Sequence, residues 1–174
     1  MTRPHLEPFL IPPERRALHL PARVRAALPV DGVAAFTVDD DASDTAVFSA
    51  RYGFGLDDCA NTLVLRFRRD GVEAHAGVVS LGSRRLDVNG AVRALLGARK
   101  ASFADRNSAT ALTGMAFGGI TAFGLPDGWR VLVDAAVMAR DEVVMGAGVR
   151  TVKLLLRPAA LAALPGAEVA ALTF

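Results

Sequence analysis

The segment from Thr62 to Val79 constrains the fold of this chain more than any other, because it predicts a β-hairpin. Thr62–Phe67 and Val72–Val79 are both rich in β-branched and apolar residues, and Arg69-Asp70-Gly71 stands between them. A turn sequence of this kind between two such runs is typical of the tight connection that joins neighbouring antiparallel strands. We therefore expect an antiparallel pair of strands here.

The remaining segments mix helical and strand patterns without the regular alternation of a βαβ fold. Residues 87–96 have apolar positions at helical spacing, with Asp87 as the N-cap and Gly97 as the stop. The other expected helices are 23–28, 46–52, 105–112 and 159–164, and the other expected strands are 33–38, 129–133, 142–145 and 151–156. This order predicts an α+β (mixed α/β) fold that contains a mixed sheet.

A single domain with an N-terminal arm is expected. Six of the nine prolines fall within the first thirty residues, where they prevent long helices. We expect residues 1–32 to form a proline-rich arm packed on one domain of residues 33–174. No stretch approaches the roughly 20 apolar residues needed to cross a bilayer, and the N-terminus has an early acid and prolines where a signal peptide has an apolar run. The sequence therefore predicts a cytoplasmic protein without a membrane span.

The few cysteines and histidines exclude several classes of site. Cys59 is the only cysteine, so this chain alone cannot form a disulfide or a thiolate metal cluster. His5, His19 and His75 lack the spacing of a zinc site. The sequence also lacks a nucleophile elbow, a Walker loop and a dinucleotide fingerprint, so no metal and no cofactor are predicted. The net charge of +2 permits a polyanionic partner without requiring one.

The glycine-dense segment 114–128 is the first candidate for a functional loop. Glycine lets a backbone approach a ligand closely, and several backbone N–H groups can then converge on one oxygen. Such an oxyanion hole suits ester hydrolysis, where negative charge develops on the carbonyl oxygen. The alternative is that these glycines only form tight turns.

Other polar residues each have a functional and a structural interpretation. Asn61 can donate a hydrogen bond into a pocket or cap a turn. Cys59 can be a nucleophile or a buried, inert thiol, and Asp134 can orient a ligand group or bind backbone. His75 is expected to be a surface or core histidine. The following basic residues can contact phosphates or form a solvated face: Arg66, Arg68, Arg69, Arg84, Arg85, Arg99 and Lys100.

Three sequence blocks, taken in order, resemble a known family. The first is Cys59–Leu65, the second is Arg85–Asp105 with its Leu-Asp and Leu-Gly-Ala sequences, and the third is Leu112–Gly124 with its Thr-Gly and Gly-Gly-Ile sequences. Followed by Asp134 and Gly146–Gly148, they are similar to the YbaK family. That family includes free-standing trans-editing factors and the editing insertion of bacterial prolyl-tRNA synthetase. The resemblance covers residues 56–172.

This resemblance implies a single domain with a curved mixed β-sheet flanked by helices, and a small pocket for the aminoacyl end of a mischarged tRNA. Family members hydrolyse the ester with loop backbone amides and the substrate's own ribose hydroxyl. By position, the implied catalytic residues are Asn61, Gly118 and Gly119. The implied substrate-binding residues are Thr113, Ile120, Thr121, Ala122, Phe123, Asp134, Gly146 and Gly148.

Two positions depart from the family pattern: Asn61 stands where the family has a lysine, and Ala122 where it has a loop proline. The resemblance implies a trans-editing aminoacyl-tRNA deacylase for a small amino acid, with tRNA as its partner in translation fidelity. One alternative is a non-catalytic module that binds an aminoacyl-nucleotide or tRNA end. Another is a structural domain whose loop 118–124 is collapsed or filled by Phe117 and Phe123. A monomer and a homodimer are both compatible with the sequence.

Overall fold

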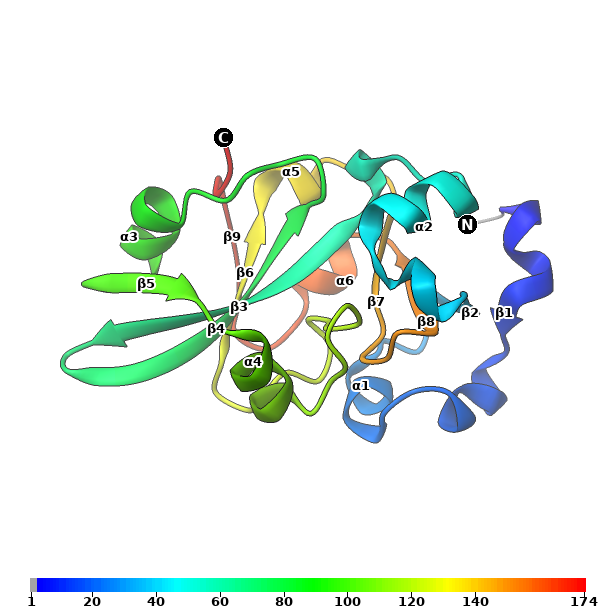
Figure 1. Cartoon of the computed structure of the whole chain (residues 1–174), viewed down its shortest axis with the longest axis horizontal. Coiled ribbons are helices and arrows are strands. Elements are labelled where there is room, and N and C mark those ends of the chain that lie inside the picture. Colours follow the sequence, from blue (N-terminus) through cyan, green and yellow to red (C-terminus); the bar gives the residue numbers. More distant parts are fainter. Residues whose placement is uncertain (1–2) are drawn as a thin grey trace.

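The computed structural model describes residues 3–174, and its strands form two sheets. The five-stranded sheet has the order β5 (Lys100–Phe103), β3 (Ala60–Arg69), β4 (Val72–Leu81), β6 (Arg130–Asp134) and β9 (Ala167–Ala170). The four-stranded sheet has the order β1 (Leu10–Ile11), β2 (Val33–Thr37), β8 (Val152–Leu156) and β7 (Val143–Gly146). A parallel bridge between Cys59, which precedes β3, and Val144 of β7 joins the two sheets, whose arrangement is seen in Figure 1. The α+β class and the mixed sheet are confirmed, and the structure adds the second sheet.

The predicted hairpin is confirmed as β3 and β4, which extend to the left of Figure 1. The two strands pair antiparallel from Ala60 opposite Leu81 to Arg69 opposite Val72. Asp70 and Gly71 have φ values of 52° and 79°. Positive φ at both turn residues is the type I′ geometry that matches the twist of the flanking strands. On the far side of β4, β6 and β9 are added in parallel, which makes the sheet mixed.

Short helices cover the sheets, and aspartates start several of them. Asp44, Asp87 and Asp105 each accept hydrogen bonds from backbone N–H groups of the following turn. These bonds satisfy donors that a helix otherwise leaves unpaired. The helices are α1 (Ala22–Ala27), α2 (Thr45–Tyr52), α3 (Arg93–Leu96), α4 (Arg106–Thr113), α5 (Ala135–Met138) and α6 (Ala159–Ala162). A π-helical turn, Val88–Val92, precedes α3, so the helix predicted over 87–96 is only partly α-helical.

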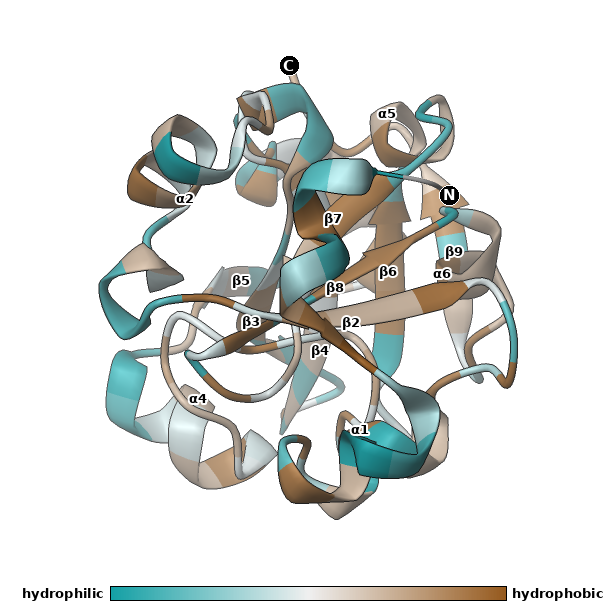
Figure 2. Ribbon diagram, turned by 90° about the vertical axis from the view of Figure 1, so that its right-hand side faces the viewer, coloured by the Kyte–Doolittle hydropathy of each residue, from teal (hydrophilic) through white to brown (hydrophobic). Residues whose placement is uncertain are grey.

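The core consists of three apolar clusters, one between the sheets and one on each outer face. Alternate residues of a strand supply different clusters: Val131 and Val133 of β6 lie between the sheets, whereas Leu132 faces the cluster near α3. Phe36 of β2 packs with Phe48 of α2 in the third cluster. This alternation is the two-residue period of a strand that is buried on both faces. In Figure 2 β7 and β8 are accordingly mostly brown, and much of the teal lies on the helices and turns around the sheets.

The N-terminal segment lies along the four-stranded sheet. β1 pairs with β2, Leu6 and Leu20 are buried, and the Arg16 guanidinium donates to the carbonyl of Val33 over 2.6 Å. Residues 1–2 of the expected arm lie outside the described residues, and the division at residue 32 stays a prediction. Within residues 3–174, no helix is long and apolar enough to cross a bilayer.

Asp134, at the end of β6, holds the C-terminal segment in place. Its side chain is only 1% exposed. It accepts hydrogen bonds from the Leu172 amide at 2.7 Å, the Thr173 hydroxyl at 2.9 Å and the Ala136 amide at 3.3 Å. A buried carboxylate with three donors of this kind has exchanged its hydration shell for protein contacts.

Replacing Asp134 with asparagine is expected to destabilise the protein by about 2–4 kcal/mol, because the charge is lost and an NH₂ group faces buried donors. In a domain of this size the Tm falls by roughly 4–16 °C. Thermal unfolding followed by circular dichroism measures the change. Asp127→Asn is the matched control, because the Asp127 side chain is fully exposed in its ion pair with Arg23. Equal Tm values for the two variants would contradict this role of Asp134.

Candidate functional site

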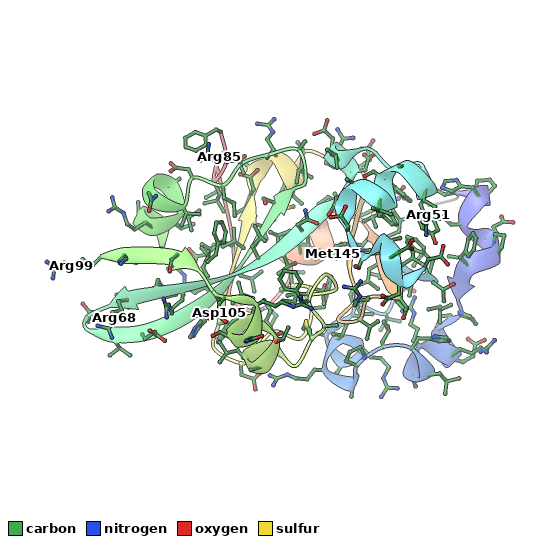
Figure 3. All side chains as sticks on the ribbon, in the orientation of Figure 1. Arg51, Arg68, Arg85, Arg99, Asp105 and Met145 are labelled. Atoms are coloured by element: carbon green, nitrogen blue, oxygen red, sulfur yellow. The ribbon has the colours of Figure 1, made fainter. Side chains whose placement is uncertain are left out.

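A cavity of about 660 Å³ opens where the start of β3, the start of α2, the β5–α4 connection and the glycine-dense loop converge. β3 belongs to one sheet, whereas Gly146 of β7 and Lys153 of β8 belong to the other, so both sheets contribute to the cavity. Its lining residues are Asp41, Ser43, Asp44, Thr45, Asn61, Thr62, Leu63, Val64, Phe103, Ala104, Arg106, Ala109, Phe117, Gly118, Ile120, Gly146, Arg150 and Lys153. In Figure 3, Met145, the neighbour of Gly146, lies at the centre of the molecule, and Asp105 marks the start of α4.

Four of the predicted site residues line this cavity: Asn61, Gly118, Ile120 and Gly146. Asn61 is half-buried, and its side-chain oxygen accepts a hydrogen bond from the Thr45 hydroxyl at 3.2 Å. This bond between β3 and α2 fixes the amide in the cavity wall. Asn61 also borders a second, small recess that is lined by Cys59 and Phe48 and shares Thr45, Gly146 and Lys153 with the cavity.

Gly118 presents its backbone to the cavity from a tight turn. The amide of Gly119 donates to the carbonyl of Ala116 at 2.9 Å, and Gly118 has a φ of 85°, as the third residue of a type II turn requires. The Gly119 amide is therefore occupied. The Gly118 amide has no acceptor among residues 3–174, which leaves it as a donor toward a ligand. A Cβ at position 118 would lie 3.2 Å from the Ser43 side chain, so glycine also keeps this side of the cavity open.

The glycine-dense loop packs backbone against backbone on the β7–β8 turn. The Gly148 amide donates to the carbonyl of Gly119 at 2.7 Å, and the Ala116 amide donates to the carbonyl of Gly148 at 3.0 Å. A Cβ at Gly119 would lie 2.3 Å from the Val149 carbonyl oxygen, and one at Gly146 would lie 2.5 Å from the Gly119 carbonyl oxygen. Glycine is thus required for close backbone contact here, which neither the oxyanion-hole nor the simple turn interpretation had included.

The other predicted substrate-binding residues lie behind the cavity wall. The Thr113 hydroxyl donates to the Ala109 carbonyl and accepts from the Met115 amide. Ala122 and Phe123 are buried in the cluster between the sheets, and Thr121 is fully buried. Asp134 binds the C-terminal segment, and Gly148, like Gly119, packs in the loop contact described above. These side chains support the wall from the core and do not reach the cavity.

Lys153 lines both the cavity and the small recess, and it was not among the residues predicted from the sequence. It interrupts the apolar run of β8, Val152–Leu156, and shares a strand face with the buried Leu155. Lys153 is only 7% exposed, and its Nζ lies 5.4 Å from the centre of the Phe48 ring. Burial lowers the pKa of the Lys153 ammonium, with a further lowering from Arg150 and opposing effects of Cys59 and Asp44. A lone cation inside an apolar strand was the signal in the sequence.

Cys59 is a buried thiol rather than an exposed nucleophile. It is 4% exposed, and its Sγ lies 3.7 Å from the Ser49 hydroxyl. Burial raises the pKa of the Cys59 thiol, so the reactive thiolate is disfavoured. Within residues 3–174, no group of three His, Cys, Asp or Glu side chains is placed to hold a metal ion.

Aromatic and cationic side chains surround the mouth of the cavity. Phe103 and Phe117 are about half exposed, and the Arg106 guanidinium lies 4.8 Å from the centre of the Phe117 ring. Arg150 donates to the Asp40 carboxylate at 2.9 Å and to the Phe117 carbonyl at 3.4 Å, which ties the loop to the Asp40–Ser43 turn. Phe117 therefore borders the cavity without filling it, and Phe123 points into the core. A collapsed or filled loop is not what the structure contains.

The predicted basic residues are exposed and lie mainly away from the cavity. Arg68 and Arg99 lie toward the hairpin end of the molecule, at the left of Figure 3. Arg68 is paired in register with Lys100 of the neighbouring β5, and Arg66 with Ser102. The same strand, β5, ends at Phe103 on the cavity mouth, so a basic strip runs from the hairpin toward the cavity. His75 is half-buried and stacks on Trp129 at 5.4 Å between ring centres.

Comparison with known proteins gives one family and several related structures. The family profile described as "Aminoacyl-tRNA editing domain" matches residues 39–164. One match is the crystal structure of a hypothetical protein, whose sequence is 26% identical to that of this chain. The TM-score is 0.69, and the match covers 76% of this chain and 85% of that one. A proposed trans-editing enzyme for prolyl-tRNA synthetase is 21% identical with a TM-score of 0.72, over 100% and 99% of the two chains. A scaffold from the computational grafting of epitope backbones is 22% identical with a TM-score of 0.73, over 95% and 99%. No curated protein matches the chain.

Gly119→Ala is expected to destabilise the protein by about 3 kcal/mol, the upper end for overpacking, because the new methyl group meets backbone atoms that cannot rotate away. Gly114→Ala is the control: it has a φ of 68° but open space around it. This control should lose only about 1 kcal/mol from its left-handed backbone. Urea unfolding compares the two variants. A Gly119→Ala variant no less stable than Gly114→Ala would contradict the close backbone contact.

Lys153→Met is expected to stabilise the protein at neutral pH by about 1 kcal/mol or more, because it removes a buried charge. The Tm should rise by roughly 2–4 °C for each kcal/mol.

The stabilisation should depend on pH. The pKa of Lys153 is lowered from 10.5 in the folded state, so the unfolded chain holds this proton more firmly. The penalty in the wild type is complete below the lowered pKa and vanishes above 10.5. The gain from Lys153→Met should therefore shrink as the pH rises through that window. Thermal unfolding at several pH values, with the exposed Lys100→Met as control, measures it, and a gain that grew with pH would contradict the burial argument.

Proposed function

This chain belongs to the aminoacyl-tRNA editing domain family, and from that premise we propose that it is a trans-editing deacylase that hydrolyses the ester of a mischarged tRNA carrying a small amino acid. The observation that supports this best is the cavity itself. It is open to solvent at a mouth of aromatic and cationic residues and contains the unpaired Gly118 amide in its wall. Its volume of about 660 Å³ falls within the range of small-molecule sites.

The proposed reaction needs few protein groups. Water adds to the carbonyl carbon of the ester, the carbonyl oxygen takes up negative charge, and the bond to the ribose oxygen breaks. The proton released by the water passes to that ribose oxygen, which gives a free amino acid and a tRNA with a free terminal hydroxyl. The Gly118 amide donates to the carbonyl oxygen where its charge develops. The neighbouring ribose hydroxyl of the substrate orients the water, in keeping with the family resemblance.

The Gly119 amide has a different part in this proposal. Because it is bound to the Ala116 carbonyl, it holds the turn that aims the Gly118 amide into the cavity. Asn61 contributes a neutral amide held by Thr45. Ile120 and Gly146 then form the apolar, closely packed side of the pocket that limits the size of the amino acid.

The surface around the cavity is suited to a nucleic acid. Exposed aromatic rings such as Phe103 and Phe117 are platforms on which a base stacks, and Arg106 and Arg150 stand beside them. The basic strip along β3 and β5 offers Arg66, Arg68 and Lys100 to the phosphates further along the acceptor stem. Charged tRNA is a cytoplasmic substrate, so the proposal places the protein in the cytoplasm.

The second candidate is a module that binds an aminoacyl-nucleotide or tRNA end without hydrolysing it. The neutral Asn61 favours this candidate, because the resemblance places a lysine there. A hydrogen bond to a charged group is worth about 1.5–3 kcal/mol, or one to two powers of ten in rate. Under this candidate the cavity and its mouth keep their binding role.

A single-turnover assay with Ala-, Ser-, Cys- and Thr-charged tRNAs tests the proposal. Wild type is expected to release at least one of these amino acids faster than buffer. Ala104→Leu, which adds bulk to a cavity-lining position, should slow the release roughly 10- to 100-fold by displacing the ester. The control is Ala111→Leu, the same change at an exposed position on α4, which should leave the rate unchanged.

Two other outcomes decide against the proposal. Folded wild-type protein that binds charged tRNA without hydrolysing it, combined with hydrolysis by Asn61→Lys, would establish the binding module. Hydrolysis that is equally slowed by Ala104→Leu and Ala111→Leu would mean that the reaction does not take place in this cavity.

A further inference from the structure

Lys153 is a buried cation with no ion-pair partner among residues 3–174. We propose that its ammonium group contacts an oxygen of the acyl group in the cavity, and so serves as the cationic ligand-binding residue of the site. This proposal rests on the proposed function and identifies the residue that reads the amino acid end of the substrate.

The burial of Lys153 is the first observation. A lysine that is 7% exposed has lost almost all of its hydration, although it occupies a strand position whose neighbour Leu155 packs in an apolar cluster. Removal of an ammonium group from water is strongly unfavourable unless another group compensates it. An apolar residue at this position would complete the cluster without the cost of desolvating a charge. Packing alone therefore does not account for a lysine here.

The lack of a protein partner is the second observation. Among residues 3–174, no carboxylate lies within ion-pair distance of the Lys153 Nζ, and no hydrogen-bond acceptor binds it. The face of the Phe48 ring lies 5.4 Å from the Nζ, and Cys59 borders the same recess. The acidic Asp44 acts on Lys153 only at longer range. A cation with three donors and one aromatic neighbour retains the capacity to bind an anionic or carbonyl oxygen.

The position of Lys153 within the cavity determines which part of the substrate it contacts. Lys153 lines the cavity and also borders the small recess that contains Asn61, Thr45 and Cys59, and it is paired in register with Gly146 of β7. The arginines of the mouth lie further out, and Arg150 is engaged by Asp40 and Phe117. An aminoacyl end that enters from the mouth therefore reaches Lys153 with its acyl group, whereas its phosphates stay near the arginines.

Two oxygens of an acyl group share the required chemistry: the ester carbonyl, and the carboxylate of an acidic amino acid side chain. In either case an N–H⋯O contact forms between the Lys153 ammonium and the oxygen, and no covalent bond to the lysine is made. The two sources differ in their kinetics, because a carbonyl contact affects every amino acid and a side-chain contact affects acidic ones only.

Lysine-specific NMR observes the contact directly, because Lys100 and Lys153 are the only lysines of the chain. Protein labelled with ¹³C at the lysine ε-carbon gives one signal for each, assigned with Lys153→Met. The probes are amide-linked 3′-alanylamino- and 3′-aspartylamino-3′-deoxyadenosine, which cannot be hydrolysed as esters. On binding, the Lys153 signal is expected to shift, and that of the exposed Lys100 should stay unchanged.

Kinetics supply the second readout. Lys153→Met should lower the deacylation rate roughly 10- to 100-fold, the loss of one charge-assisted hydrogen bond, in a protein that remains folded. A loss with both Ala- and Asp-charged tRNA assigns the contact to the ester carbonyl. A loss confined to Asp-charged tRNA assigns it to the side-chain carboxylate. Unchanged rates with both substrates would overturn the proposal.

The NMR outcome separates this proposal from the proposed function. If calorimetry shows that the analogues bind while the Lys153 signal does not move, only the role of Lys153 is overturned. If neither analogue binds to the folded protein, the proposed function fails, and the role of Lys153 fails with it.

Discussion

The contact between the glycine-dense loop and the β7–β8 turn is the constraint on which the rest of the site depends. Two stretches of backbone meet there without intervening side chains, at Gly119 against Val149 and at Gly146 against the Gly119 carbonyl. Backbone contacts of this kind are rigid because there is no rotamer to adjust. They set the position of the turn that contains Gly118, whose amide has no acceptor among residues 3–174. The wall of the cavity is thus built by the main chain and supported from behind by Thr113, Ala122 and Phe123.

The parts of the fold that could be predicted are those with local signals. The β3–β4 hairpin is specified by two apolar runs and an Asp-Gly turn, and the predicted helices α2 and α4 begin in the structure at the aspartate caps Asp44 and Asp105. β9 was missed because Ala167–Ala170 has little β-propensity and is held by pairing with β6, a contact between distant segments. The division into two sheets could not be predicted either, because it depends on the pairing of strands that are distant in sequence. Residues 87–96 were predicted as one helix, whereas a π-helical turn precedes α3; the helix predicted over 159–164 is shorter, Ala159–Ala162.

The family resemblance located the region of the candidate site correctly, but it did not separate the roles of the individual residues. Asn61, Gly118, Ile120 and Gly146 line the cavity, whereas Gly119 and Gly148 are needed for backbone packing and Asp134 for the C-terminal segment. A sequence block contains both kinds of residue, and only the three-dimensional arrangement separates them. Lys153 was missed because residues 151–156 were predicted only as a strand, and the lysine that interrupts its apolar run was given no role. Lysine is almost never fully buried unless it is paired, so a lysine in an apolar strand indicates a binding partner more directly than the strand pattern does.

The four-stranded sheet has a consequence for how the chain acquires its structure. β2, near the N-terminus, pairs with β8, near the C-terminus, whereas β3 and β4 are adjacent in sequence. The hairpin can therefore form soon after its residues leave the ribosome, but β2 must wait for almost the entire chain before its neighbour exists. Closing such a long loop is entropically costly and slows folding. Since the cavity is lined by β3 from one sheet and by β7 and β8 from the other, it is completed only at that late step, and an unfinished chain has no site.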